Sequence, residues 1–368
     1  MDPSFFTVRQ AGAFALLLLA LLLLPALLGK GMLPDRVEVY SSLSTRYGPF
    51  HYVERQIFDE TSDIDIAFVG SSHLLHGIDT PYVEAKLSEK LGRKAVVTTL
   101  GWGGAGFDGV YFVLRDLLRH RKAKVVVIYD ECANRNPEVP QPICSHWFRY
   151  GEDRDLLAGL PAPTQLALYS DAILGLPRNL LSMVRSNLPT RWAPGKRTTY
   201  DQYYHSTNPA ERLGSEAARL AYEGKGTFAE YTPPTVVPPS EVFVYHESTR
   251  GKFRFTGPGT PDYQLHFAQR VAAMARAHGT TLVILHLPDI AEKRSTTIDE
   301  REDLAARLPA DITLLGVPPA ALFAGLTDAD VTKLYSDATH FNQNGQQYFT
   351  SVITPALLEI YDSATAAH

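Results

Sequence analysis

This chain has little cysteine and no excess of positive charge. Cys132 and Cys144 are the two cysteines among 368 residues, and they could form a disulfide in an oxidising compartment or remain two thiols. The 35 lysines and arginines are outnumbered by 40 acidic residues, which gives a formal net charge of -5. Nucleic-acid-binding proteins carry a basic patch or stripe, and the sequence has none. We therefore expect no nucleic-acid partner.

Charged residues are also absent from residues 10–29, where leucine and alanine dominate. About 20 helical residues cover a hydrocarbon core of about 30 Å. A cleaved signal peptide and a buried core helix are the alternatives, but the segment has no convincing small-x-small cleavage site and no polar face. We expect residues 1–32 to form a cytoplasmic tail and an uncleaved anchor, with residues 10–29 in the lipid bilayer. The flanking basic residues do not fix its orientation.

Short apolar runs alternate with amphipathic stretches after residue 63. This alternation predicts an α/β fold with a single parallel sheet in a three-layer domain, its strands buried on both faces. The predicted strands cover residues 64–69, 95–100, 124–129, 281–287 and 312–317. The predicted helices cover residues 81–91, 110–119, 262–278 and 343–361, the last interrupted near Pro355.

The regular alternation is lost between residues 152 and 251, where prolines are frequent. Insertions of this kind sit at loop ends, often over an active site. We predict a connector over residues 33–62, an α/β domain formed by residues 63–151 and 252–368, and an insertion or cap over residues 152–251.

A serine turn follows the first predicted strand, in the sequence Gly70-Ser71-Ser72-His73. A serine there projects from the carboxyl edge of a parallel sheet, where ligands bind. Ser72 is the candidate nucleophile, although chemistry alone does not separate it from Ser71. Both serines could instead serve as helix N-caps.

A second motif, Asp337-Ala338-Thr339-His340, precedes the last predicted helix. Asp337 could hold one ring nitrogen of His340 while the other nitrogen faces a serine, which is the arrangement of nucleophile, base and orienting group in acyl transfer. The alternative is a solvated histidine beside a helix cap.

Glycines follow the second predicted strand, and their spacing has two interpretations. Gly101, Gly103 and Gly106 fit the dinucleotide fingerprint, with Asp130 where a ribose-binding acid is expected. A lone fingerprint is a weak signal, however, and backbone N–H groups of such a loop can also bind an oxyanion. We favour the oxyanion loop.

These motifs together resemble the SGNH (GDSL-type) hydrolase and acyltransferase superfamily, which has Gly-Ser-Ser-x after the first strand and Asp-x-x-His-x-Asn-x-x-Gly near the end. The resemblance implies a triad of Ser72, His340 and Asp337, with the oxyanion bound by the N–H groups of Ser72 and Gly101. In the superfamily, the asparagine of a Gly-x-Asn-Asp element after the third strand is a third donor to the oxyanion. That element is missing here, and Asn134 does not align cleanly with it as a candidate for the same role. In this departure the chain resembles divergent members of the superfamily, such as the D-alanyl transfer protein of teichoic acids and the alginate-type O-acetyltransferases.

Several further residues are candidates for lining the pocket. They are Ser71, His73, Trp102, Gly103, Gly104, Asp130 and His286. His73 and His76 are spaced to share a metal ion, but no third ligand is evident, so we expect no metal and no cofactor. Trp102 could stack on a sugar ring or simply pack, and His286 could line the pocket or lie in the core.

With the anchor at residues 10–29, we expect a single-pass membrane protein whose catalytic domain is periplasmic or extracellular. The expected activity is O-acyl transfer, with acetyl as the expected group, to a cell-envelope or extracellular polysaccharide. A membrane-bound partner would supply the acyl group. An esterase or polysaccharide deacetylase is the first alternative, and a non-catalytic polymer-binding or scaffold component of an export complex is the second.

Overall fold

The computed structural model describes residues 7–28, 36–43, 49–104, 106–129, 144–148, 150–170, 242–245, 247–255, 260–300 and 312–366. The chain divides into two compact units. One contains Met1–Leu43 and Val139–Leu188, and the other contains Ser44–Glu138 and Pro189–His368. Cys132, Asp130 and Asn134 lie outside the described residues, as does most of the predicted insertion.

The first unit is helical. Its helices are α1 (Val8–Leu28), α2 (Arg36–Ser42), α7 (Cys144–Trp147) and α8 (Tyr150–Leu157). The buried rings of Tyr40 and Trp147 pack with their centroids 5.5 Å apart. No helix in the described part of the chain combines the length and the mean hydropathy that a membrane span requires. The anchor over residues 10–29 therefore stays a prediction.

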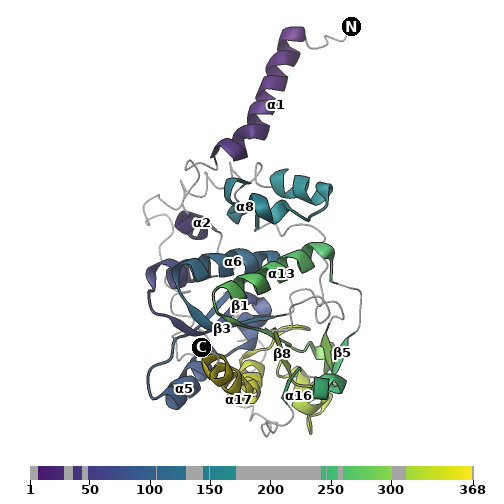
Figure 1. Cartoon of the computed structure of the whole chain (residues 1–368). Coiled ribbons are helices and arrows are strands. Elements are labelled where there is room, and N and C mark those ends of the chain that lie inside the picture. Colours follow the sequence, from purple (N-terminus) through teal and green to yellow (C-terminus); the bar gives the residue numbers. More distant parts are fainter. Residues whose placement is uncertain are drawn as a thin grey trace, which may run out of the picture. The chain divides into compact units, whose positions relative to one another are not determined.

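The second unit is built on a six-stranded sheet in the order β2-β1-β3-β6-β8-β4 (Figure 1). The strands are β1 (Ile64–Ser71), β2 (Val97–Trp102), β3 (Ala123–Tyr129), β4 (Phe243–Val244), β6 (Thr281–Leu285) and β8 (Thr313–Gly316). Five of these strands are parallel, and β4 runs antiparallel to β8. The α/β class is confirmed, but the sheet is mixed. The expectation of a wholly parallel sheet was wrong because β4, from the segment predicted as an insertion, adds to its edge.

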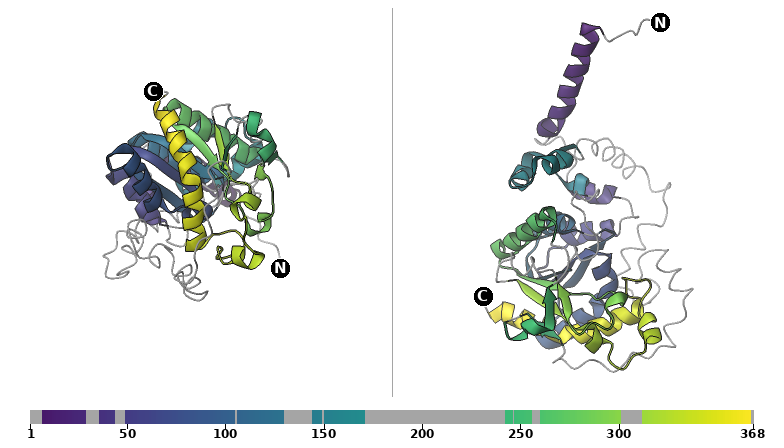
Figure 2. Two further views of the ribbon diagram at one scale, coloured as in Figure 1. Left: turned by 90° about the horizontal axis from the view of Figure 1, so that it is seen from below. Right: turned by 90° about the vertical axis from the view of Figure 1, so that its right-hand side faces the viewer.

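Helices cover both faces of this sheet. The long helices are α5 (Thr80–Leu91), α6 (Phe107–His120), α13 (Asp262–Ala277) and α17 (Gln343–Ala366). Figure 1 shows α6 and α13 together on one face, with α5 and α17 on the other. Seen from below, α17 crosses in front of the strands (Figure 2). A separate pair of short parallel strands, β5 (Phe253–Phe255) and β7 (Ile298–Glu300), lies outside the main sheet.

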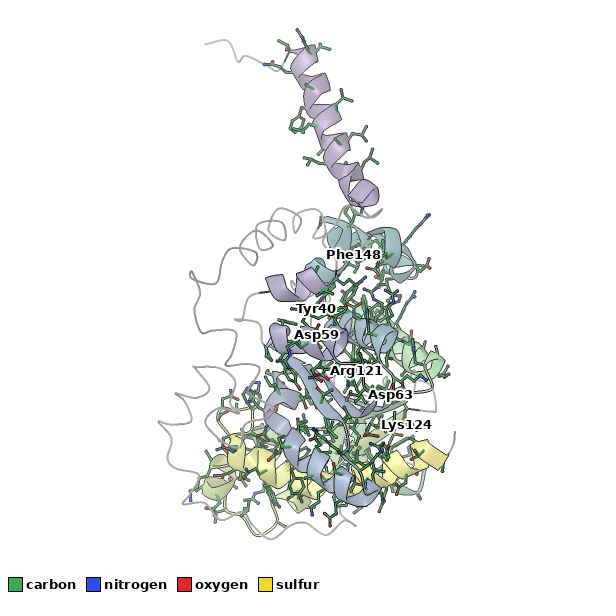
Figure 3. All side chains as sticks on the ribbon, turned by 90° about the vertical axis from the view of Figure 1, so that its left-hand side faces the viewer. Tyr40, Asp59, Asp63, Arg121, Lys124 and Phe148 are labelled. Carbon is green, nitrogen blue, oxygen red and sulfur yellow. The ribbon has the colours of Figure 1, made fainter. Side chains whose placement is uncertain are left out.

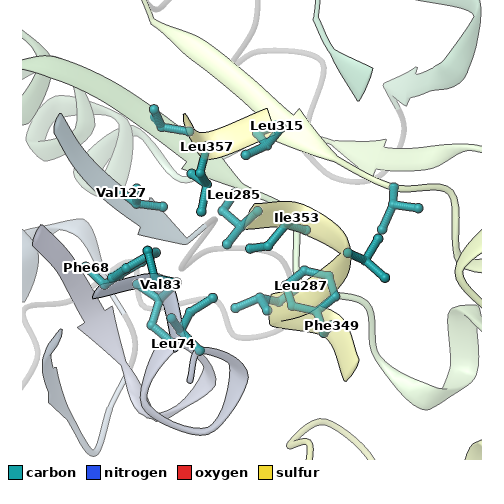
Figure 4. Close-up of a cluster of buried hydrophobic side chains, with 14 of the residues drawn as sticks. Phe68, Leu74, Val83, Val127, Leu285, Leu287, Leu315, Phe349, Ile353 and Leu357 are labelled. Carbon is teal, nitrogen blue, oxygen red and sulfur yellow. The ribbon is translucent and has the colours of Figure 1, made fainter. Parts of the chain in front are cut away.

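The core between the sheet and α17 is continuous and apolar. Phe68, Val127 and Leu285 come from neighbouring strands and pack with Ile353 and Leu357 of α17 (Figure 4). This packing explains why α17 continues through Pro355, where an interruption was expected. Buried residues on both sides of the proline hold the helix on the sheet, and tertiary packing of this kind outweighs one lost backbone hydrogen bond.

Part of the predicted connector is helical and belongs to the second unit. Helix α3 (Phe50–Glu54) continues into a π-helical turn, Arg55–Asp59. Phe50, Val53 and Ile57 are buried there. Nearby, Arg121 donates hydrogen bonds to the carbonyl oxygens of Gln56 and Ser62, at 2.6 and 2.8 Å. Figure 3 labels Arg121 close to Asp59 at the end of the π-helical turn. These contacts fasten the segment to the end of α6.

Candidate active site

The two predicted serines lie where strand β1 passes into helix α4 (Ser72–Gly77). Strand β1 is paired with β2 on one side and β3 on the other. Its carboxyl end is therefore flanked by the ends of two parallel strands, which is where open α/β sheets bind ligands.

The structure gives the two serines different environments. Ser71 is buried and is the N-cap of α4, where its hydroxyl accepts a hydrogen bond from the backbone N–H of His73 at 3.3 Å. Ser72 is partly exposed, and its Oγ lies 2.8 Å from Nε2 of His340. Capping occupies Ser71, so Ser72 is the serine whose geometry suits a nucleophile.

His340 is held at the end of a short closed turn. Tyr335 and Phe341 pair as an antiparallel bridge at the base of this turn. The backbone N–H of Ser336 donates to the carbonyl oxygen of His340 at 2.8 Å. The backbone N–H of Ile290 donates to the carbonyl oxygen of Ala338 at 3.0 Å, which ties the turn to the loop after β6. Hydrogen bonds within the turn and one from Ile290 therefore hold the turn in place.

Asp337 orients the imidazole of His340. Its Oδ1 accepts the backbone N–H groups of Thr339 and His340, each at 2.8 Å, and its Oδ2 lies 2.9 Å from His340 Nδ1. Burial raises the pKa of Asp337. The two N–H groups and the nearby imidazole together outweigh this effect and lower the pKa to about 2. The ionised carboxylate favours a proton on Nδ1, and Nε2 can then accept the proton of Ser72.

Asn342 and Gly345 place this turn at the start of α17. The side chain of Asn342 accepts the backbone N–H of Gly345 at 3.2 Å and donates to the carbonyl oxygen of Lys333 at 2.6 Å. A Cβ atom at Gly345 would lie 2.2 Å from the carbonyl oxygen of Leu334. The asparagine and the glycine of the Asp-x-x-His-x-Asn-x-x-Gly pattern are therefore explained here by hydrogen bonding and by close packing, respectively.

The predicted oxyanion residues are less clearly placed. Gly101 lies inside β2, opposite Gly70, because the strand continues two residues beyond its predicted end. A Cβ atom there would approach Leu75 Cβ to 3.0 Å, so close packing of α4 explains this glycine. Gly103 and Gly104 are exposed in the following loop. The N–H of Ser72 belongs to the first turn of α4, whose N–H groups have no intrahelical partner. The oxyanion roles stay predictions.

The other pocket candidates fall into two groups. Trp102 is buried against Gly109, which supports the packing interpretation over sugar stacking. His286 is also buried, and its Nε2 lies 3.4 Å from a carboxylate oxygen of Glu292. His73, in contrast, lies against His340, with ring centroids 4.6 Å apart. Within the described ranges, no group of three or more His, Cys, Asp or Glu side chains is arranged to hold a metal ion.

Sequence reasoning missed one contact and one residue of the site. His76 also contacts His340, with ring centroids 5.4 Å apart. The spacing of His73 and His76 could have indicated this, because residues three apart share one helix face. Gln346 was missed as well, and its side chain joins α17 to the end of α4. No motif predicts such a contact.

The arrangement provides a hydrogen-bonded chain of hydroxyl, imidazole and carboxylate beside the start of a helix. Such a chain can generate a serine nucleophile and return a proton to a leaving group. A scan against models of protein families finds no match for this chain, and a search of curated proteins finds none either.

Proposed function

We propose that this chain is a serine-dependent O-acyltransferase, related to the SGNH superfamily, that acts on a cell-envelope or extracellular polysaccharide. The observation that supports it best is the unbroken chain from Ser72 Oγ through His340 to Asp337, at 2.8 and 2.9 Å. Residues 10–29 would anchor the protein in the bilayer, with the site outside the cytoplasm. A membrane-bound partner would supply the acyl group, with acetyl as the expected group.

In the first half of the proposed reaction, Ser72 is acylated. Its Oγ attacks the carbonyl carbon of the donor while His340 Nε2 takes the hydroxyl proton, and Asp337 stabilises the imidazolium. The N–H of Ser72 and a second N–H, from Gly101 at the end of β2 or from Gly103 or Gly104 just after it, bind the oxyanion. The intermediate then collapses, the bond to the leaving group breaks, and His340 protonates the leaving group.

In the second half, a sugar hydroxyl of the acceptor attacks the acyl-serine. His340 takes the proton of that hydroxyl and gives it to Ser72 Oγ as the ester bond to the enzyme breaks. The partial exposure of Ser72 and His340 supports a large acceptor, because a polymer can approach such a site from solvent. The same exposure admits water, which supports an esterase or deacetylase as the second candidate.

The test is a burst assay on the full chain in detergent, with a chromogenic acetyl ester and mass spectrometry of the trapped protein. We expect one acetyl group on Ser72, no adduct in Ser72→Ala, and slow acylation in His340→Ala. Oligosaccharide acceptors that speed release of the acetyl group and become acetylated support the transferase. Release at the same rate with and without acceptor supports the esterase.

Absence of both adduct and turnover, with the donor partner also present, would count against catalysis. In that case a polymer-binding or scaffold role becomes the better proposal. Binding of polysaccharide by Ser72→Ala with unchanged affinity would then be expected.

A further inference from the structure

The imidazole of His340 contacts two other histidine rings, both from α4. The ring of His73 packs against it at a tilt, with centroids 4.6 Å apart and planes 31° apart. The ring of His76 meets it edge-on, with centroids 5.4 Å apart and planes 76° apart. His340 thus has a carboxylate at Nδ1, a hydroxyl at Nε2, and ring contacts from His73 and His76.

The contact with His73 leads back to the sheet. The His73 ring also stacks on Tyr129, with centroids 4.9 Å apart and planes 14° apart. Tyr129 is buried at the end of β3. His73 is fixed along the chain as well, because its backbone N–H bonds to Ser71. Ring contacts therefore run from Tyr129 on a central strand through His73 to His340 on a turn.

These ring contacts matter because the hydrogen bond that Asp337 accepts from His340 Nδ1–H is poorly shielded from solvent. The side chain of Asp337 is 57% exposed, whereas that of His340 is 22% exposed. An ion pair open to water contributes little and holds its geometry weakly. A ring that can swing away from Ser72 loses the alignment that proton transfer requires. Packing of the His340 ring against the His73 ring restricts that motion without depending on charge.

His76 completes the surroundings of His340. Burial lowers the pKa of His76, and the charge of a protonated His340 lowers it further, against a smaller opposite effect of Asp337, to about 4. Its ring is therefore neutral near pH 7. A neutral neighbour does not oppose the positive charge that His340 takes up during the reaction.

We propose that His73 is a positioning residue for His340, and that its ring, supported by Tyr129, keeps Nε2 of His340 directed at Ser72. This inference rests on the proposed function, because positioning has a catalytic effect only if Ser72 is acylated. It assigns a role to a residue that neither donates nor accepts a proton in the reaction.

The test compares three variants of the full chain. His73→Ala removes the ring, His73→Phe keeps a flat ring without nitrogen atoms, and His278→Ala changes an exposed histidine at the end of α13. We expect kcat for ester turnover to fall about 10- to 100-fold in His73→Ala with KM nearly unchanged. We expect His73→Phe to recover to within about threefold of the parent protein, and His278→Ala to match it.

Folding of each variant is checked by circular dichroism. If His73→Ala does not fold, His73→Leu replaces it, because leucine fills much of the space without a flat ring. Parent-like turnover in the ringless variant would overturn the inference. A His73→Phe protein as slow as the ringless variant would also overturn it, because a ring nitrogen rather than stacking would then be required.

A second measurement separates this inference from the proposed function. Nitrogen-15 spectra of the imidazoles report the tautomer of His340 and do not require turnover. If the parent protein is never acylated at Ser72, the proposed function fails. Loss of the single Nδ1–H tautomer in His73→Ala would still support positioning, and an unchanged spectrum would overturn it.

Discussion

The side-chain nitrogen of Gln346 donates a hydrogen bond to the carbonyl oxygen of Ile78 at 3.0 Å. It also donates to the carbonyl oxygen of Leu75 at 3.2 Å. Close by, Thr350 Oγ1 accepts the backbone N–H of Asp79 at 2.8 Å. Helix α17, which starts just after His340, is therefore fastened to the end of the helix that begins with Ser72. The distance between nucleophile and base depends on this junction.

Replacing Gln346 with leucine is expected to loosen the junction. The change removes the two hydrogen bonds that the side chain donates to the end of α4, at a cost of about 1–3 kcal/mol in the free energy of unfolding. Denaturant titration measures this cost, and the rate of Ser72 acylation measures the effect on the site. Gln347→Leu, at the exposed neighbouring position, is the matched control and is expected to stay within about 0.5 kcal/mol. Equal effects of the two variants would contradict the prediction.

Replacing Ser71 or Ser72 with alanine is expected to have opposite effects on stability and on acylation. Ser71→Ala removes the N-cap of α4 and is expected to cost about 1 kcal/mol of stability, while Ser72 is still acylated. Ser72→Ala is expected to keep the stability and lose the adduct. Thermal unfolding and peptide mapping of the labelled protein distinguish the two. An adduct found on Ser71 in the parent protein would reverse the assignment.

Asp337→Asn is expected to reduce turnover by on the order of 10³-fold, because an amide does not favour the Nδ1–H tautomer of His340. Stability provides a second readout. The folded-state pKa of Asp337 is lowered from 3.8 to about 2, so its carboxylate adds stability above about pH 4, and this is lost as the pH falls through 2. Unfolding of parent and variant between pH 5 and pH 2 checks this. A difference in stability that does not shrink towards pH 2 would contradict it.

Tyr361→Phe tests a buried carboxylate away from the site. Asp65 accepts the hydroxyl of Tyr361 at 2.7 Å, two nitrogens of Arg93 at 2.6 and 2.9 Å, and the N–H of Val96 at 2.8 Å. Burial raises the pKa of Asp65, but these donors together lower it below its usual value. Loss of the hydroxyl is expected to cost about 1 kcal/mol near pH 7 and less in acid, where Asp65 takes up a proton. Urea titration measures this, with Tyr111→Phe as the control.

Much of the candidate site could be predicted from the sequence because its residues lie in short motifs. A strand followed directly by two serines places them at the sheet edge, and an Asp three residues before a His brings the two side chains together. The resemblance favoured Ser72 over Ser71, but the residues alone did not separate them, because that depends on which hydroxyl caps the helix. The spacing of His73 and His76 indicates that they share one helix face. Their contacts with His340 join distant segments, so the spacing does not identify His340 as the partner.

The sheet shows the same limit. The predicted strand 124–129 is apolar at every position after Lys124, which made a buried strand easy to predict. Strand β4 has two residues, Phe243 and Val244, which is too short for any periodic pattern. Its antiparallel pairing follows from the position of β8 rather than from its own residues. Pro355 indicated a break in α17, but packing against the sheet overrides that local preference.

Ser72 and His340 are 268 positions apart in the chain. A ribosome makes Ser72 early and the turn containing Asp337 and His340 much later. During synthesis the growing chain therefore carries its nucleophile without its base, and contacts between such distant positions also form late in folding. The proposed chemistry can begin only once α17 has docked, so activity itself reports that folding is complete.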